Sequence, residues 1–207
     1  MRITSITGIG DKGEKFSVLF DNGEKLITSA SQIADFCLYE GREISDDEFA
    51  ELRAALNLGS SKTRALRILG NRNLSSGELA KRLVRRGVEA SVADETVEWL
   101  ESIGAVDDAE YARLIVRHYI SKGYGLARVR DEFYRRGIPR EIWDDALADA
   151  DGFIDAAQDF LNKKLRGSSG KADLRKAAEA LRRRGFSYSE STEAVSRYLE
   201  SLDEKET

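Results

Sequence analysis

The sequence predicts a mainly α-helical protein in which tandem three-helix repeats form an elongated, curved array behind a small N-terminal module of strands and helices. Charged residues make up 34% of the chain and proline occurs once, a balance that favours helices with solvated faces. Apolar residues recur at helical spacing from Lys62 onward. Two arginines followed by a glycine occur three times, at Arg85-Arg86-Gly87, Arg135-Arg136-Gly137 and Arg183-Arg184-Gly185.

The first 60 residues predict a separate module that begins with a three-stranded antiparallel meander. Apolar and polar residues alternate over residues 3–6 and 16–20, as they do in a half-buried strand. Asp21-Asn22-Gly23 is a hairpin turn signal that leads into Leu26 and Ile27. A second turn around residues 10–13 would join the first two strands.

Two helices are expected to complete this module, because three strands this short need something to pack on. One lies near residues 31–38. The other begins at Ser45, where Ser45 and Glu48 have the spacing of a capping box. Gly59 predicts the end of this second helix.

The remaining chain predicts three repeats. The three glycines are spaced by 50 and 48 residues, a period typical of stacked helical units. The residue four positions before each glycine and the residue after it are apolar each time, as Leu83 and Val88, Phe133 and Ile138, and Leu181 and Phe186. We expect the modules at residues 1–60, 62–107, 108–150 and 151–202, with a disordered tail at 203–207.

Local signals place the helix ends inside the repeats. Ser75 and Glu78 have capping-box spacing, and Asp107-Asp108 is interpreted as a helix cap rather than a metal-binding or catalytic pair. Gly123-Tyr124-Gly125 predicts a break between helices, and Pro139 suits the first turn of the next helix. Four aromatic residues at apolar helical positions are expected in the core, Trp99, Tyr111, Tyr119 and Trp143.

Charge is distributed unevenly along the chain. The net charge of −4 argues weakly against a protein that only binds nucleic acid. Residues 1–61 hold six lysines and arginines against eleven acidic residues, whereas residues 62–86 hold eight basic residues and only Glu78 as an acid. An acidic module beside a basic repeat suggests that residues 1–60 mask the basic face until a partner displaces them.

Enzymatic chemistry is not expected. One cysteine, Cys37, and one histidine, His118, cannot form a disulfide or a multi-histidine metal site, so we expect no cofactor and no metal. The pattern Gly8-x-Gly10-x-x-Gly13 lies in a hairpin connection without a following helix, which excludes a dinucleotide site. No run approaches the roughly 20 apolar residues that cross a bilayer, so we expect a cytoplasmic monomer without membrane contact.

The arginines are the candidate binding residues, because guanidinium groups form paired hydrogen bonds with carboxylates and phosphates. The alternative is that they only complement helix dipoles, which favour cations in the last turn by ~0.3–1 kcal/mol. The candidate contact residues are Arg82, Arg85, Arg86, Arg135, Arg136, Arg182 and Arg183.

Several short segments follow one another in a specific order and spacing. They are Leu74-Ser75-Ser76-Gly77-Glu78-Leu79, Leu83 with Arg86-Gly87-Val88, Leu100 with Ala105-Val106-Asp107-Asp108 and Tyr111-Ala112, Gly123-x-Gly125 with Val129, and Arg136-Gly137-Ile138. By these segments, residues 62 to about 200 resemble the RecX family, regulators of the RecA recombinase. Residues 1–60 add a strand-rich module that shorter members of that family lack.

This resemblance implies a partner and a function. Members of the family lie in the groove of the RecA filament on DNA and restrain its ATPase and strand exchange, so the chain would regulate recombination, DNA repair and the SOS response. Single-stranded or double-stranded DNA is a second expected partner. Two alternatives stay open on the residues alone: a stand-alone DNA-binding repeat protein and a helical scaffold for protein–protein interaction.

Overall fold

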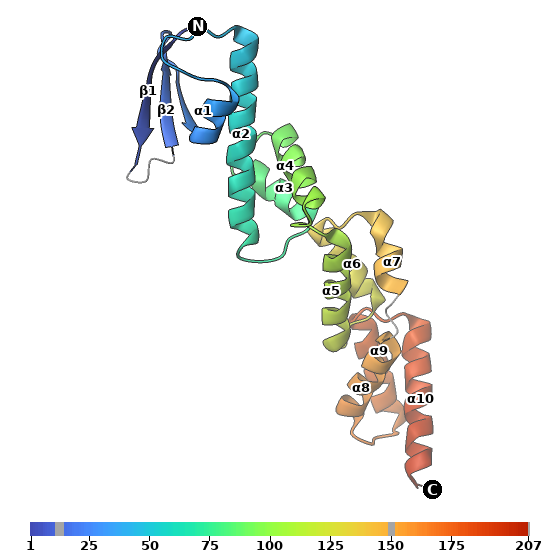
Figure 1. Cartoon of the computed structure of the whole chain (residues 1–207). Coiled ribbons are helices and arrows are strands. Elements are labelled where there is room, and N and C mark those ends of the chain that lie inside the picture. The colour runs from blue at the N-terminus through green and yellow to red at the C-terminus, as the bar shows by residue number, and fades with distance from the viewer. Residues whose placement is uncertain (11–14, 149–151, 207) are drawn as a thin grey trace. The chain divides into compact units, whose positions relative to one another are not determined.

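The structure, a computed structural model, is mainly helical with one small sheet, as predicted (Figure 1), and describes residues 1–10, 15–148 and 152–206. The chain divides into two compact units. Unit 1 contains Met1–Gly70 and Leu83–Thr96, and unit 2 contains Asn71–Arg82 and Val97–Thr207. No helix in the described ranges is both long enough and apolar enough to cross a membrane.

Unit 1 opens with the predicted antiparallel meander. Strands β1 (Ile3–Ile9), β2 (Lys15–Phe20) and β3 (Lys25–Ser29) pair in the order β1-β2-β3. The strand-joining turn expected around residues 10–13 falls largely on residues 11–14, which lie outside the described residues. The sheet residues that alternate inward join the core of the module, which confirms the half-buried pattern read from the sequence.

Two helices follow the sheet, α1 (Ala30–Asp35) and α2 (Asp46–Leu69). Ser45 caps α2 and forms the predicted capping box with Glu48. The Phe20 and Phe49 rings meet edge to face with centroids 5.1 Å apart, which fixes α2 against the sheet. The buried core of the module contains Ile3, Val18, Phe20, Leu38, Ile44, Phe49 and Leu52.

Helix α2 corrects two predictions. It continues through Gly59 to Leu69, so neither the helix end at Gly59 nor the module boundary after residue 60 is present. A β-carbon at Gly59 would lie 3.3 Å from the Gln32 Nε2 atom of α1. Glycine at this position therefore permits the close approach of α1, and does not end the helix.

The remaining helices follow the predicted repeat pattern. In the first repeat, α3 (Ser76–Arg85) and α4 (Ala90–Ser102) follow the second half of α2. The second contains α5 (Asp108–Ser121), α6 (Leu126–Arg136), the short 3-10 turn Arg140–Ile142 and α7 (Trp143–Ala148). The third contains α8 (Phe153–Leu165), α9 (Lys171–Arg183) and α10 (Tyr188–Glu206).

The predicted caps are present, and the residues expected to form a disordered tail are helical from 203 to 206, the last described residue. Ser75 accepts the Glu78 amide at 3.0 Å, and Asp107 accepts the Glu110 amide at 2.8 Å. Residues 203–206 continue α10, because glutamate and lysine, three of the four residues there, are good helix formers and Leu202 packs against the core of unit 2. The expected boundary between the second and third repeats falls at residues 150 and 151, outside the described residues.

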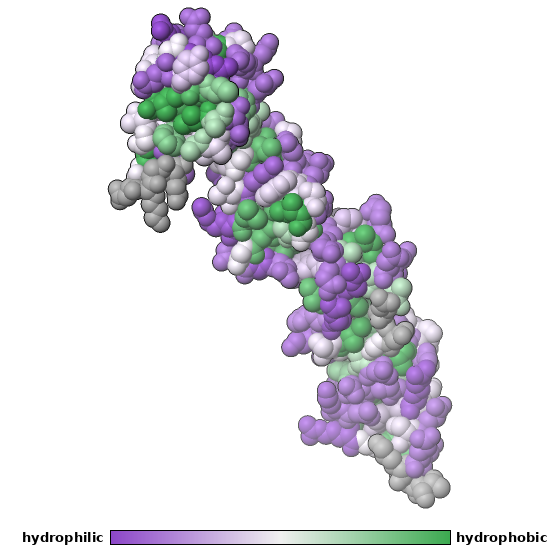
Figure 2. All heavy atoms as spheres, in the orientation of Figure 1, coloured by the Kyte–Doolittle hydropathy of each residue, from purple (hydrophilic) through white to green (hydrophobic). Residues whose placement is uncertain are grey.

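The core of unit 2 is formed by residues of the second and third repeats together. Phe133, Leu161 and Leu181 are fully buried in it. Tyr111, Tyr119 and Trp143 pack against this core, as the sequence predicted for them. Figure 2 shows hydrophilic residues over most of the visible face around α8, α9 and α10, which fits helices that bury one apolar stripe and expose charge elsewhere.

Candidate protein and nucleic-acid interface

The three glycine helix ends have the same geometry. Gly87, Gly137 and Gly185 have φ angles of 83°, 65° and 93°, all in the left-handed region. At each helix end, the amide of the residue after the glycine donates to the carbonyl of the residue four positions before the glycine. This bond defines a Schellman motif. These bonds are Val88 to Leu83 at 3.1 Å, Ile138 to Phe133 at 3.0 Å and Phe186 to Leu181 at 3.2 Å.

Within unit 2, two of these helix ends form junctions between consecutive repeats. The start of α3 contacts the end of α6, where the Ser75 hydroxyl donates to the Arg136 carbonyl. The start of α6 contacts the end of α9, where the Gly125 amide donates to the Arg184 carbonyl at 2.9 Å. Each junction thus places the positive end of one helix dipole against the negative end of another.

Glycine makes both junctions close enough to form. A β-carbon at Gly77 would lie 2.7 Å from the Gly137 carbonyl oxygen. A β-carbon at Gly125 would lie 2.5 Å from backbone atoms of Gly185 and Phe186. Because real β-carbons do not approach backbone atoms this closely, the glycines specify how the repeats stack as well as where helices end.

Arg136, one of the candidate contact residues, is held by side chains of the first and second repeats. Its Nε donates to the Glu132 carboxylate at 2.5 Å, and its Nη1 donates to the Tyr111 hydroxyl. The guanidinium carbon lies 5.4 Å from the Tyr111 ring centroid, and Glu78 approaches Nη1 to 3.8 Å. These contacts leave 30% of its side chain exposed, and through Glu78 on α3 Arg136 links the first and second repeats.

Glu132 is the buried acid at the centre of this network. It lies on α6 with 5% of its side chain exposed and also binds Arg135, through Nη2 at 2.6 Å and Nε at 2.8 Å. Burial alone would raise its pKa, but hydrogen bonds from Arg135, Arg136 and Tyr119 outweigh burial and hold the pKa below its ordinary value. Glu132 is therefore ionised at neutral pH and holds two guanidinium groups.

Arg184 has the corresponding place in the third repeat. Its guanidinium carbon lies 4.5 Å from the Phe160 ring centroid and 5.2 Å from the Tyr124 ring centroid. Its Nη1 donates to the carbonyls of Lys122 at 2.9 Å and Gly123 at 3.1 Å. Arg184 thus joins the second and third repeats by stacking and by hydrogen bonds.

The other candidate arginines are more accessible. Arg85, Arg86, Arg182 and Arg183 are exposed, and Arg82 is half-buried. Arg135 keeps 70% of its side chain exposed although Glu132 binds it. Because Arg85 and Arg86 are exposed in the unit that also contains the N-terminal sheet, the acidic module does not mask them, which corrects that hypothesis.

Two tyrosines beside the arginines were missed by sequence reasoning. Tyr134, which precedes Arg135, and Tyr188 are each 73% exposed. The Arg182 guanidinium carbon lies 6.0 Å from the Tyr188 ring centroid. Exposed tyrosine beside arginine is typical of protein–protein hot spots and of stacking sites for unpaired bases.

The roles of Arg184 and Glu132 were also missed. The spacing of the three glycines could have revealed Arg184, which aligns with Arg86 and Arg136 directly before a glycine. Glu132 had no such signal, because its burial depends on α5 packing against α6. His118 is exposed, with its ring against Tyr119.

Comparison with known proteins identifies two of the three repeats. Residues 62–100 match the family description "RecX, first three-helix domain", and residues 107–147 match "RecX, second three-helix domain". Regulatory protein RecX of Xanthomonas axonopodis pv. citri is 37% identical over 127 residues, which are 59% of this chain and 78% of that protein. The Stenotrophomonas maltophilia protein of the same description is also 37% identical, over 59% of this chain and 77% of its own length.

Two solved structures share the fold. A crystal structure described as regulatory protein RecX matches with a TM-score of 0.72 at 21% identity, over 91% of this chain and 96% of its own. RecX from Lactobacillus salivarius matches with a TM-score of 0.63 at 19% identity, over 72% of this chain and 98% of its own. The first of these structures covers 91% of this chain, so the matched region includes part of residues 1–60. The N-terminal module therefore has at least a partial counterpart in that structure.

Proposed function

This chain belongs to the RecX family of regulatory proteins, and from that premise we propose that it binds the RecA filament on DNA and lowers the filament's ATPase and strand-exchange activity. The observation that carries the proposal beyond the family name is the exposure of Arg85, Arg86, Arg182 and Arg183 at the ends of the second helices of two repeats. A recombinase filament on DNA offers carboxylates and phosphates, the two groups that guanidinium forks bind best.

The proposed contact set is smaller than the set expected from the sequence. It contains the exposed residues Arg85, Arg86, Arg135, Arg182 and Arg183. Arg136 is left out, because Glu132 and Tyr111 already occupy its guanidinium. Arg82 is left out because it is half-buried on α3.

The test is ATP hydrolysis by RecA on single-stranded DNA with increasing amounts of this protein. We expect inhibition at a substoichiometric ratio for the unaltered chain. The double substitution Arg182→Ala with Arg183→Ala should require about tenfold more protein, since charged hydrogen bonds at an interface contribute on the order of 1.5–3 kcal/mol. Unchanged ATPase with the unaltered chain contradicts the proposal.

A matched control separates the arginine pair from total charge. Arg175 and Lys176 are exposed on the same helix, α9. Changing both to alanine removes the same net charge and should leave inhibition unchanged. If this control weakens inhibition as much as the Arg182 and Arg183 change, the filament responds to overall charge and the proposed contact set is wrong.

The scaffold alternative makes a different prediction for the same proteins. If the arginines serve only helix dipoles, the Arg182 and Arg183 substitutions should lower the melting temperature and leave ATPase inhibition by the folded protein intact. Circular dichroism melts of the same samples decide between the two readings.

A further inference from the structure

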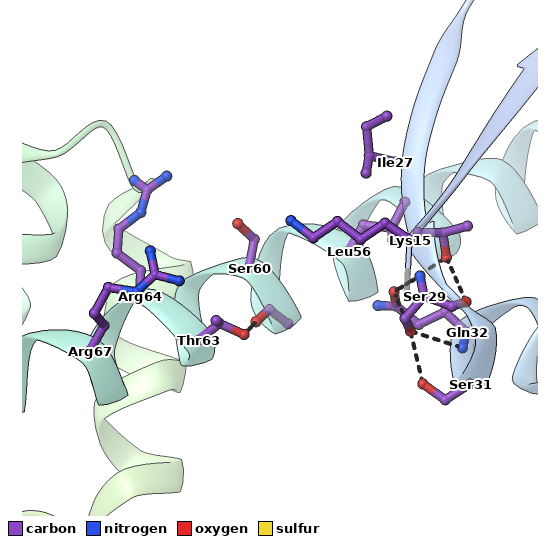
Figure 3. A pocket seen from close by; sticks show the side chains of 12 residues that line it. Lys15, Ile27, Ser29, Ser31, Gln32, Leu56, Ser60, Thr63, Arg64 and Arg67 are labelled. Carbon is purple, nitrogen blue, oxygen red and sulfur yellow. Dashed lines mark hydrogen bonds between the residues drawn. The ribbon is translucent and has the colours of Figure 1, made fainter. Parts of the chain in front are cut away.

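Unit 1 contains an open groove between the N-terminal sheet and α2, with a volume of about 730 Å³. Lys15 on β2, Ile27 on β3, Gln32 on α1, and Arg64 and Arg67 on α2 lie along it. Figure 3 shows Lys15 extending toward the Ser60 turn of α2, with Arg64 and Arg67 projecting from the following turns. The groove therefore joins the sheet to the first helix of the first repeat.

The groove is positively charged although it lies partly in the acidic N-terminal segment. Arg64 and Arg67 come from the basic segment that begins at Lys62, Lys15 comes from the acidic residues 1–61, and the described lining contains no carboxylate. The Arg64 Nη1 donates to the Arg86 carbonyl at 2.9 Å, a neutral acceptor that leaves the charge of the guanidinium unbalanced. Cations gathered in a groove raise its local potential and attract anions even in an acidic protein.

The uncharged lining suits phosphate oxygens. Ser29, Ser31, Ser60 and Thr63 supply hydroxyl groups, and Gln32 supplies an amide. Gln32 is fixed in place, since its Oε1 accepts the Ser29 backbone amide at 3.1 Å while its own backbone N–H donates to the Ser29 hydroxyl at 3.3 Å. The Thr63 hydroxyl already donates to the Gly59 carbonyl at 3.0 Å, and the Ser29 hydroxyl donates to Gln32 Oε1 at 3.2 Å. The Ser60 hydroxyl and the Gln32 side-chain NH2 are therefore the uncharged donors that the groove offers to a phosphate oxygen, which can only accept.

The length and apolar content of the groove favour a polymer over a single phosphate ion. From Leu56 to Arg67, α2 extends about 16 Å at 1.5 Å per residue, and both residues line the groove. Ile27, which is 47% exposed, and the half-buried Leu56 offer apolar contacts between the cations. A single nucleic-acid strand combines regularly spaced anions with apolar bases, and proteins bind it with charged grooves that also carry apolar contacts.

Arg64 connects the groove to the helix end that carries the exposed arginines of the first repeat. It lines the groove and bonds to the backbone of Arg86 at the end of α3. Arg85 and Arg86 are exposed at that helix end, and all three arginines belong to unit 1. A smaller hollow beside the groove shares Ser60 and Arg64 and contains Glu89, so the proposed phosphate contacts are confined to the groove itself.

We propose that the groove between β3, α1 and α2 binds the sugar-phosphate backbone of single-stranded nucleic acid, with Lys15, Arg64 and Arg67 contacting phosphates. This gives the strand-rich N-terminal module a role in direct nucleic-acid binding. The binding needs no recombinase and so does not depend on the proposed function.

The experiment measures fluorescence anisotropy of a labelled oligothymidylate with the full-length protein at increasing salt. Lys15→Glu with Arg67→Glu should raise Kd at least tenfold and lower the salt slope by about 1.4, since each phosphate contact on a single strand contributes about 0.7. Ser60→Glu, which places a carboxylate in the groove and removes no cation, should also weaken binding. Melting curves verify that each variant is folded.

The control is Lys25→Glu with Arg53→Glu, the same charge change on β3 and α2 but outside the groove. It should keep most of the affinity. Equal loss in groove and control variants overturns the proposal, as does unchanged binding in both groove variants. Displacement of the oligonucleotide by oligoglutamate at equal concentration also overturns the proposal, because the groove would then bind carboxylates as well as it binds phosphates.

The recombinase ATPase assay distinguishes this proposal from the proposed function. A protein that inhibits the ATPase while its groove variants bind the oligonucleotide normally disproves only the groove. A protein that binds the oligonucleotide through the groove and leaves the ATPase unchanged disproves only the regulatory function.

Discussion

Four Gly→Ala substitutions distinguish the two reasons why glycine is needed in this fold, a positive φ angle and a close backbone contact. Gly70 has a helical φ of −58° and room for a methyl group, with its nearest neighbour 3.6 Å away. Gly87 has φ +83° in open space. Gly125 has φ −89° but a backbone contact at 2.5 Å, and Gly185 has both φ +93° and a backbone contact at 2.7 Å.

These geometries give a ranked set of stabilities. Gly70→Ala should raise the free energy of unfolding by ~0.4–1 kcal/mol, because alanine restricts only the unfolded chain. Gly87→Ala should lower it by ~1–2 kcal/mol through backbone strain. Gly125→Ala should lower it by roughly 2–5 kcal/mol, from overpacking together with loss of the Gly125 bond to Arg184. Gly185→Ala should be the most destabilising.

Urea unfolding followed by circular dichroism measures the four values, and hydrogen exchange locates the effect. In Gly125→Ala the amides of residue 125 and Ala127, which donate to Arg184 and Gly185, should lose protection before the rest of unit 2. If Gly125→Ala matches Gly70→Ala within about 0.5 kcal/mol, the size expected of a neutral surface change, the close approach does not specify the junction and the reasoning fails.

Two further predictions concern the buried network and the stacked arginine. Glu132→Gln should destabilise the protein by ~1–3 kcal/mol at neutral pH, less than a fully buried pair because Arg135 is exposed. Because folding lowers the pKa of Glu132, the stability difference between the unaltered protein and Glu132→Gln should be constant above pH 4.5 and shrink as the pH falls through the folded pKa. A stability difference that grows in acid contradicts the assignment of Glu132 as an ionised, hydrogen-bonded carboxylate. Arg184→Lys should cost ~1–2 kcal/mol in thermal melts, whereas Arg183→Lys, at an exposed site, should change little; equal effects would mean that stacking on Tyr124 and Phe160 contributes nothing.

Local chemistry explains which parts of the fold were predictable. The caps at Ser45, Ser75 and Asp107 are correct because a capping side chain bonds to its own helix within three residues. The left-handed glycines at positions 137 and 185 end their helices through bonds of similarly short range. Neither signal depends on which other helix lies nearby.

The errors arise where a residue responds to a distant part of the chain. Glycine often ends a helix, but Gly59 lies inside α2 and leaves space for the Gln32 side chain of α1. Glu132 has the identity of a surface residue on a charged helix, yet the aromatic and basic groups of α5 and α6 bury it. The groove that contains Lys15 and Arg67 joins residues from four elements, which no local pattern could bring together.

Position within the Arg-Arg-Gly signature decides what each arginine does. The residue directly before the glycine has its carbonyl at the junction, so in the second and third repeats its side chain lies between repeats, as Arg136 and Arg184 do. Gly87 has open space where a β-carbon would lie, and its preceding carbonyl is bound by Arg64 instead. Arg86 is consequently exposed while its two counterparts are engaged. The same signature thus stacks repeats where another repeat precedes it and leaves both arginines available where none does.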